Sequence, residues 1–381
     1  MSTVISPLLQ RSLDIADGYL EPIIELTTRL TEVSAPSNDE MDRARVVEKE
    51  LQTLGYEDVQ MDEIGNVTAR IAGKDRSKCL LIAAHTDTVF PRDVDLTVTR
   101  KESTLHGPGI GDNTVAVATV AMLKRAFEQL GEQPAIDIVI TGNVGEEGLG
   151  DLRGMKAVVI GLPDIAGAIA VEGHALGSVT YDAVGSRRYR VKVTGKGGHS
   201  WGQAGTPSAI HHLAHLIADM DDIQLFSTPK TSFNAGIVSG GISVNTIAPE
   251  AIAVLDMRST SSESLENLVQ QVDAILASPT PEGVGVEVEV VGDRPAGTQP
   301  ADAPLVKIAD GVLTELGLNI RHEPSSTDAN VPIAQGIPAV CIGVTTGSFA
   351  HREDEFINIA PIPTGFAHLL TVILRSAEAL A

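Results

Sequence analysis

Histidine and carboxylate side chains gather in five short segments of the sequence, and these residue types bind divalent metal ions through nitrogen and oxygen. The segments are HTD at 85–87, HGPGIGD at 106–112, GEEG at 145–148, VEGH at 171–174 and HREDE at 351–355. Three of them follow apolar runs that are typical of buried strands. Because the ends of parallel strands converge at one edge of a sheet, the five segments together predict a single metal site.

Two of these segments indicate different roles for neighbouring side chains. Residues two apart on a strand point to the same side, so Asp87 is expected beside His85. A carboxylate in that place suits the orientation of a metal-binding imidazole. In the pair Glu146 and Glu147, one carboxylate would bind a metal ion while the other acts as general base on a water molecule.

Each segment also has a plainer interpretation. A lone histidine is often a hydrogen-bonded core residue, although the nearby Asp87 disfavours this for His85. Asp112 precedes an expected helix, and taken alone it is favoured as the cap of that helix. A glutamate pair is usually a solvated surface feature. The apolar run at 136–141 disfavours this for Glu146 and Glu147, because buried carboxylates need a positive partner.

The elements that must position these residues follow from hydrophobic periodicity. Apolar runs at 79–84, 136–141 and 168–171 are nearly continuous, as expected of strands buried on both faces, and a further strand is expected at 66–72. A helical pattern at 115–130 separates the first two runs. The alternation of strands and helices predicts an α/β fold, with a mostly parallel sheet and helices on both faces.

The pattern changes after about Gly177. Alternating strands are expected at 187–193, 232–238 and 251–256, with a further strand at 284–291. Helices are expected from Thr206-Pro207, with Thr206 as the cap, and from about Ser262. The α/β character returns near Arg294, with a helix from about Pro304, a buried strand at 339–343 and a helix from about Pro363.

We therefore predict one catalytic domain, formed by residues 1–177 and 294–381, that is interrupted by an α+β domain at 178–293. A chain of 381 residues is longer than one ordinary core requires, which fits this division.

Composition and charge exclude several classes of protein. The 43% hydrophobic content excludes wholesale disorder, and a formal net charge of -22 argues against partners such as nucleic acid or an anionic membrane surface. Cys79 and Cys341 lie in apolar runs and indicate reduced core thiols, with a single bridge between them left open. No basic and apolar leader and no stretch of about 20 apolar residues is found, so we expect a soluble, cytoplasmic protein.

Taken together, the motifs resemble the two-metal peptidases and deacylases, a family that includes peptidase T, the aminoacylases, acetylornithine deacetylase and succinyl-diaminopimelate desuccinylase. The resemblance continues through GKGGHS at 195–200, GGISVNT at 240–246, LDMR at 255–258 and STDAN at 326–330, and so covers nearly the whole chain. The segments GDN and GEEGLGDLRG are most similar to peptidase T-like members. The catalytic domain would then have the zinc-exopeptidase-like fold.

The resemblance implies a ligand set for two divalent metal ions. His85 and Glu172 would bind one ion, Glu147 and His351 would bind the other, and Asp112 would bridge both. Zinc is the favoured metal, and manganese and cobalt are alternatives.

The same resemblance implies the catalytic roles. Asp87 would orient His85, and Glu146 would be the general base. The interrupting domain would be the family's lid and dimerisation domain, which makes the protein a homodimer. Its His199 would stabilise the oxyanion, often across the subunit boundary.

Four further residues would contact the substrate. The resemblance implies that Asn245 and Arg258 hold a substrate carboxylate or backbone, and that the loop of Ser326 and Thr327 lines the same pocket. One segment departs from the family pattern. Many members follow the bridging aspartate with another acid or methionine and then Lys-Gly-Gly, whereas NTVA at 113–116 stands here. The departure concerns the pocket wall, and with it substrate choice, more than metal binding.

A second histidine group needs a separate interpretation. His211 and His215 are one helical turn apart, a spacing that can chelate zinc, but no glutamate follows His211 as the HExxH motif requires. A polar face of a lid helix is the favoured account. Trp201, the only tryptophan, is assigned to packing or to an interface rather than to substrate binding.

Three functions remain. The favoured one is a peptidase T-like exopeptidase, a tripeptide aminopeptidase, acting on small peptides. The second is an amidohydrolase of N-acyl or otherwise modified amino acids, or of another C–N bond such as that of an aromatic amine. The third is a non-catalytic homologue, which the complete histidine and carboxylate set disfavours because such a cluster is destabilising without metal ions.

Overall fold

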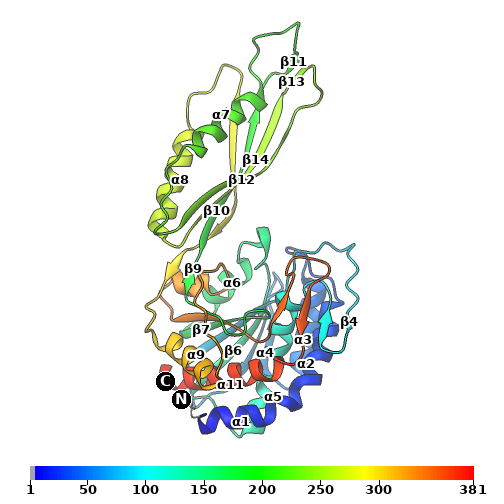
Figure 1. Cartoon of the computed structure of the whole chain (residues 1–381), viewed down its shortest axis with the longest axis vertical. Helices are drawn as coiled ribbons and strands as arrows, with labels where there is room; N and C mark the ends of the chain where they lie inside the picture. The colour runs from blue at the N-terminus through cyan, green and yellow to red at the C-terminus, as the bar shows by residue number, and fades with distance from the viewer. Residues whose placement is uncertain (1–4) are drawn as a thin grey trace. The chain divides into compact units, whose positions relative to one another are not determined.

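The computed structural model describes residues 5–381 and divides them into two compact units (Figure 1). Unit 1 comprises the described residues up to Ala183 together with Gln299–Ala381, and unit 2 comprises Val184–Thr298. The predicted borders of the interrupting domain, 178 and 293, lie six and five residues before those of unit 2.

Unit 1 is built on a seven-stranded sheet. Its strands, in spatial order, are β1 (Glu57–Met61), β2 (Val67–Ile71), β6 (Ile136–Asn143), β3 (Asp75–His85), β7 (Ile165–Glu172), β17 (Ala339–Gly343) and β8 (Val179–Thr180). The four strands β6, β3, β7 and β17 are parallel, as predicted. The outer strands pair antiparallel, so the sheet is mixed. Only antiparallel strands can be joined by a link as short as that between β1 and β2.

Alternate residues in the second half of β3 supply two separate cores, which explains why residues 79–84 are apolar without interruption. Leu80, Ile82 and Ala84 belong to the core on one face, whereas Leu81 and Ala83 belong to the core on the other. The strand is therefore buried on both faces, as its sequence predicts.

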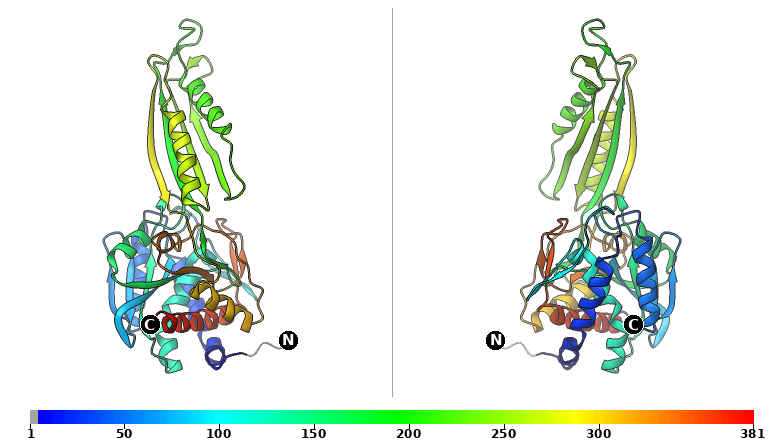
Figure 2. Two further views of the ribbon diagram at one scale, coloured as in Figure 1. Left: turned by 90° about the vertical axis from the view of Figure 1, so that its left-hand side faces the viewer. Right: turned by 90° about the vertical axis from the view of Figure 1, so that its right-hand side faces the viewer.

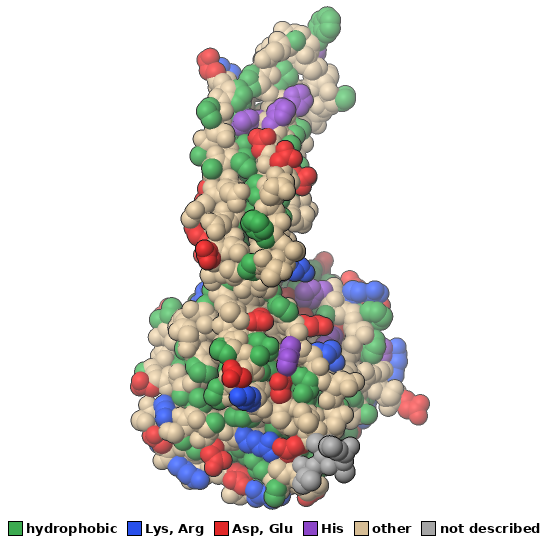
Figure 3. Space-filling view, turned by 60° about the vertical axis from the view of Figure 1, so that its left-hand side comes forward, with side chains coloured by type: hydrophobic (Ala, Val, Ile, Leu, Met, Phe, Trp, Pro, Cys, Tyr) green, Lys and Arg blue, Asp and Glu red, His purple; other side chains and the backbone are tan. Residues whose placement is uncertain are grey.

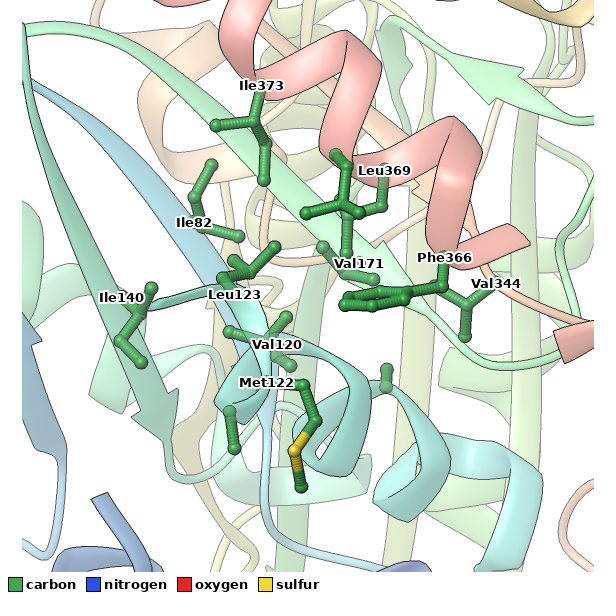
Figure 4. Close-up of a cluster of buried hydrophobic side chains, with 14 of the residues drawn as sticks. Ile82, Val120, Met122, Leu123, Ile140, Val171, Val344, Phe366, Leu369 and Ile373 are labelled. Atoms are coloured by element: carbon green, nitrogen blue, oxygen red, sulfur yellow. The ribbon is translucent and has the colours of Figure 1, made fainter. Parts of the chain in front are cut away.

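Helices cover both faces of this sheet, which confirms the predicted α/β class. The larger core includes residues of α1 (Pro7–Ala16), α2 (Leu20–Thr31), α3 (Met41–Thr53), α4 (Val115–Ala121), α5 (Leu123–Leu130), α9 (Pro304–Glu315) and α11 (Ile362–Leu380). The smaller core includes residues of α6 (Arg153–Gly161) and α10 (Asn330–Ala334). In the larger core, Phe366 and Leu369 of α11 lie close to Val171 of β7 and Val120 of α4 (Figure 4).

The helix predicted at 115–130 is two helices, α4 and α5, which meet at Met122. The N–H of Met122 bonds to the Thr119 carbonyl three residues back, at 3.2 Å, so the regular helical bonding is interrupted. Hydrophobic periodicity continues across this turn and therefore did not reveal it. A small antiparallel sheet completes unit 1, with strands β18 (Gly347–Ser348), β19 (Phe356–Asn358), β5 (Thr104–His106) and β4 (Thr99–Arg100).

Unit 2 contains a four-stranded antiparallel sheet in the order β12 (Thr231–Gly240), β14 (Glu250–Ser259), β10 (Gly185–Thr194) and β15 (Gly285–Arg294). Two helices, α7 (Ala209–Asp221) and α8 (Ser262–Leu276), cover one face of it (Figure 2). Burial alternates along β14, as expected of a strand with one covered face. A short ribbon pairs β11 (Gly198–His199) with β13 (Thr246–Ile247).

The start of α7 differs from the prediction. The helix begins at Ala209, and the extended Ser208 occupies the cap position in place of Thr206. The N–H of Ala209 bonds to the Ala248 carbonyl at 3.0 Å, so a contact with the segment before β14 fixes the first turn. Both cysteines are buried and unpaired, which confirms the predicted thiols. Among residues 5–381, no helix has the length and apolar character that crossing a bilayer requires.

Candidate metal centre

The carboxyl ends of three parallel strands carry the central residues of the site. His85 is the last residue of β3, Glu172 is the last residue of β7, and β6 ends at Asn143, shortly before the two adjacent glutamates. His85 pairs in register with Asn143. The parallel arrangement therefore brings residues from three distant parts of the chain to one edge of the sheet, as is usual for sites in α/β folds.

The five residues predicted to bind metal lie together in unit 1. Nε2 of His85 is 3.2 Å from Oδ1 of Asp112 and 3.8 Å from Oε2 of Glu172. Nε2 of His351 is 3.2 Å from Oδ2 of the same Asp112 and 3.1 Å from Oε1 of Glu147. Asp112 thus directs one oxygen to each histidine, which is the placement that a bridging carboxylate needs.

Ligand-type atoms form three groups in which every atom lies within 4.8 Å of the others. The groups are His85 with Asp112 and Glu172, Asp112 with Glu147 and His351, and His85 with Glu146 and Glu147. Glu146, the predicted general base, is therefore adjacent to both halves of the cluster. Both glutamates of the pair are buried, in contrast to a solvated surface pair.

Asp112 does not cap the following helix, so that alternative is wrong. Helix α4 begins at Val115 with Thr114 at the cap position, and Asp112 lies before it with non-helical dihedral angles, φ -116° and ψ 83°. The peptide bond between Asp112 and Asn113 is cis. The Asn113 side chain, at the start of the segment that departs from the family pattern, is buried and donates to the Val171 carbonyl at 2.7 Å.

Asp87 contacts more than the histidine that it was predicted to orient. Nδ1 of His85 is 3.1 Å from the backbone carbonyl of Asp87 and 3.6 Å from its Oδ1. The Asp87 carboxylate accepts the backbone N–H groups of Glu146 at 2.9 Å and Glu147 at 3.0 Å, and the hydroxyl of Ser37 at 2.6 Å. Asp87 therefore holds the loop of both glutamates, and Ser37 is a contact that the sequence did not indicate.

A buried arginine lies beneath the same loops. Arg43 donates to the carbonyls of Val33 at 2.9 Å and Thr86 at 2.8 Å, and also to Thr31. Burial lowers the pKa of Arg43 to about 10, opposed by the charge of Asp87, so the side chain stays cationic at neutral pH. A positive charge in this place partly balances the carboxylates above it.

The electrostatics of the cluster indicate a shortage of positive charge. Hydrogen bonds to Asp112 and Glu147 raise the pKa of His351 to about 10, against a smaller effect of burial. For His85, burial lowers the pKa, but the bonds to Asp112 and Asp87 outweigh it and the pKa lies well above its usual value. Burial and the neighbouring carboxylates raise the pKa of Glu172. In the absence of metal ions, protons on these groups balance the charge of the carboxylates, which divalent cations would neutralise better.

Ser326 and Thr327 also belong to unit 1, in the loop before α10. Thr327 is buried, and its N–H bonds to the Asn330 side chain at 2.9 Å. The next residue, Asp328, accepts from the Asn143 amide at 2.8 Å, which ties the loop to the carboxyl end of β6. The loop therefore reaches the edge of the sheet where the cluster lies.

Two predicted residues meet in unit 2. The N–H of Ser200, which follows His199, bonds to the Asn245 carbonyl at 3.0 Å, and both predicted residues are exposed. Nδ1 of His199 accepts the N–H groups of Trp201 and Gly202, each at 3.2 Å. Because Nδ1 is an acceptor, the proton of the neutral ring is on Nε2, which leaves an outward hydrogen-bond donor.

Arg258 is not brought together with these two residues within unit 2. Residue Thr194, near the His199 loop, pairs with Glu250 at the start of β14, whereas Arg258 pairs with Ser186 at the other end. Eight positions of strand separate Glu250 from Arg258, or about 27 Å. Asp256 accepts from Nε of Arg258 at 2.6 Å and holds the guanidinium in place.

Other residues of unit 2 that the sequence drew attention to are solvent-facing. Histidine side chains gather on the surface of this unit (Figure 3), and α7 carries His211, His212 and His215. Among residues 5–381, the groups of three metal-type ligands do not include them. Trp201 is 87% exposed, which rules out packing within the chain as its role.

Sequence and structure comparisons agree with this geometry. The family model described as Peptidase family M20/M25/M40 matches residues 81–375. A succinyl-diaminopimelate desuccinylase from Corynebacterium glutamicum is 24% identical over 346 residues, which cover 88% of this chain and 91% of the relative.

Two solved structures show that the fold is shared. A tripeptidase from Staphylococcus aureus has a TM-score of 0.79 at 22% identity and covers 94% of this chain and 99% of its own. A dinuclear metal-binding peptidase from Bacillus subtilis has a TM-score of 0.66 at 16% identity and covers 95% of this chain and 99% of its own.

Proposed function

The chain belongs to peptidase family M20/M25/M40 and is a hydrolase of peptide or amide bonds, and from this premise we propose that it is a tripeptide aminopeptidase that uses two divalent metal ions. One observation carries the proposal. Asp112 is shared by two groups of ligand atoms, and an adjacent carboxylate, Glu146, is left over for proton transfer. A cluster of acidic residues with a purely structural role would not require a shared carboxylate and a further one adjacent to it.

The residues of the cluster fit the proposed ions. His85 and Glu172 would hold one ion, Glu147 and His351 the other, and Asp112 both. Imidazole and carboxylate ligands suit zinc, which we favour, and also manganese and cobalt. When bound, two such ions would lower the pKa of an attacking water molecule and polarise the scissile carbonyl group.

Glu146 is placed to carry the proton of the reaction. The residue is 7% exposed and its carboxylate lies among the ligand atoms, while its backbone N–H bonds to Asp87 at 2.9 Å. We propose that it accepts a proton from the attacking water and passes it to the leaving amine. Asp87 would keep this base in place and orient His85 through its backbone carbonyl.

The remaining residues would bind the substrate. The Nε2 proton of His199 would stabilise the oxyanion, and the neighbouring Asn245 would hold the substrate backbone. Arg258 is cationic and half-exposed, which suits a substrate carboxylate. The loop of Ser326 and Thr327 in unit 1 would also contact the substrate.

We also propose a homodimer that forms through unit 2. Thr194, which precedes the His199 loop, and Arg258 lie at opposite ends of the paired strands β10 and β14, so we propose that a site that uses both His199 and Arg258 draws on two copies of the chain. Strand β12 is an edge strand with exposed Ile237 and Val238, and an uncovered edge is a template for pairing with another chain. The two unpaired cysteines support the proposal of a cytoplasmic location.

The relatives favour a peptidase but keep a deacylase as the second candidate. The tripeptidase from S. aureus supports the first function, and the desuccinylase from C. glutamicum supports hydrolysis of an N-acyl amino acid. The proposed roles of Arg258 in binding a substrate carboxylate and of Glu146 as general base apply to hydrolysis of either a peptide bond or an N-acyl bond.

A substrate panel tests the proposal. The full-length protein is stripped of metal, reconstituted with zinc, manganese or cobalt, and assayed on tripeptides, dipeptides and N-acetyl amino acids. We expect release of the N-terminal residue from tripeptides, with a Glu146→Gln preparation as the control for contaminating activity. Preferred hydrolysis of N-acetyl amino acids would replace the proposal with the deacylase, and inactivity with every metal would favour a non-catalytic homologue.

A further inference from the structure

A fully buried carboxylate outside the ligand set contacts the loop of the shared ligand. Glu355 is 0% exposed. Its Oε2 accepts the N–H of Gly109 at 2.6 Å, and its Oε1 accepts those of Gly111 at 3.0 Å and Asp112 at 2.9 Å. Its backbone carbonyl also accepts the N–H of Gly107 at 3.1 Å. One residue thus satisfies four backbone groups of the segment 107–112.

This segment depends on such a partner, because its short helical turn at Ile110–Thr114 is irregular. Gly109 has φ +72°, and Asp112 has non-helical dihedral angles, so their N–H groups have no helical partner. Buried backbone N–H groups are almost always paired, and several that converge on one point form a site for an anion. The carboxyl oxygens of Glu355 are the acceptors at that point.

Close packing leaves the segment little room to move. A side chain at Gly109 would meet Cγ2 of Thr88 at 2.5 Å, and one at Gly111 would meet Nε2 of His174 at 1.6 Å. The glycines of HGPGIGD therefore allow the backbone to approach its neighbours. Glu355 bonds to the backbone N–H of Asp112 itself. Because that backbone is held in place, the direction of the Asp112 side chain is set as well.

Glu355 also lies next to the segments of two other ligands. Nε2 of His174 is 3.2 Å from Oε1 of Glu355, and His174 follows Glu172 by two residues. His351 precedes Glu355 by four residues, in a loop where His351 itself has φ +66°. A left-handed conformation in a residue other than glycine persists only where its surroundings enforce it. The segments of three of the five proposed ligands therefore meet at this one carboxylate.

We propose that Glu355 is a positioning residue that sets the Asp112 carboxylate between the two cation positions. The inference rests on the proposed function, because it assumes that the cluster binds two ions. Loss of the Glu355 bonds would let the 107–112 segment shift, so that one Asp112 oxygen no longer reaches its ion. At least one of the two ions would then bind more weakly, while the ligands themselves stay intact.

Metal titration of the full-length protein tests this role. Metal-free wild type, Glu355→Gln and a matched variant, Glu353→Gln, are titrated with Co²⁺, with calorimetry, bound metal per chain and the visible cobalt spectrum as readouts. Glu353 is exposed and two residues away, so its variant makes the same substitution without touching the segment. We expect two ions in wild type and Glu353→Gln. In Glu355→Gln we expect one ion to bind about 10- to 100-fold more weakly, with an altered spectrum.

Each outcome decides between the alternatives. If Glu355→Gln binds both ions as wild type does and only its melting temperature falls, Glu355 is merely structural and the proposal is overturned. If Glu355→Gln does not fold, Glu355→Asp decides, since it keeps the charge but withdraws the oxygens by one methylene. Weaker binding of one ion in that variant supports the proposal, and wild-type binding of both overturns it. Failure of wild type to bind any ion would instead refute the proposed function.

Discussion

The proposed site residues of the two units are held in opposite ways. In unit 1 the ligands are anchored by contacts between segments far apart in the sequence, such as that of Glu355 with Asp112. In unit 2 His199 and Asn245 are exposed, and the contacts that hold them lie within one short ribbon and its turns. The candidate metal ligands therefore depend on packing of the unit 1 core, whereas the proposed substrate-binding residues of unit 2 depend on a separate unit.

The largest loss of turnover is expected from a substitution in unit 1. Glu146→Gln removes the general base but keeps its size and its backbone bond to Asp87. Turnover should fall by about 100- to 10,000-fold while both proposed metal ions remain bound, because Glu146 is not one of the five proposed ligands. Steady-state kinetics and metal analysis check this.

The adjacent residue provides the matched control for that variant. Glu147→Gln should lose metal, since Glu147 contacts His351 at 3.1 Å within a ligand group. If both variants keep metal and full turnover, the assignment of the pair is wrong.

A somewhat smaller loss of turnover is expected from a substitution in unit 2. His199→Ala removes the proposed oxyanion donor, so kcat should fall by about 100- to 1,000-fold. Metal content and melting temperature should not change, because the side chain is exposed and bonds only within its own turn. Steady-state kinetics, metal analysis and thermal unfolding measure these three quantities.

His215→Ala is the control within the same unit, since His215 is also exposed but lies on α7. Equal losses in the two variants would mean that His199 acts through the stability of unit 2 rather than through the substrate.

The smallest expected effect concerns acid stability, in which the two units should also differ. His368 of α11 is 0% exposed, and burial lowers its pKa to about 4. The unfolded chain, with a histidine pKa of about 6.5, binds the proton first as the pH falls. The free energy of unfolding of unit 1 should therefore decrease by about 1 kcal/mol between pH 7 and pH 5.5 through this residue alone.

His368→Leu should remove that part of the pH dependence and leave unit 2 unaffected. Urea unfolding at the two pH values, followed by pulsed hydrogen exchange, reports on the units separately. An unchanged pH dependence in the variant would show that His368 is not the titrating group.

The sequence predicted much of the fold because periodicity is a local signal. The strand at 339–343 and the helix that begins near Ser262 were placed within a residue of β17 and α8. The prediction from sequence failed where a contact with a distant segment determines the backbone conformation. The break at Met122 lies inside a continuous apolar pattern, and the start of α7 depends on the carbonyl of Ala248.

The site shows the same limit. The five proposed ligands were recognisable because each lies in a short motif beside an expected strand end. The residues that hold them were not, because Ser37 and Arg43 contact the site from a loop and a helix whose sequences carry no such motif. Glu355 was visible within HREDE, but nothing local indicates that it reaches a segment 243 residues away.

The interruption of unit 1 by unit 2 has a consequence for the order of events during synthesis. Unit 2 is continuous, so it can fold as soon as residue 298 has been made. Unit 1 still lacks β17, α11 and both His351 and Glu355 at that moment. The nascent chain therefore carries an acidic, incomplete cluster until residues 351–355 emerge, so we expect the proposed metal ions to bind only late in synthesis.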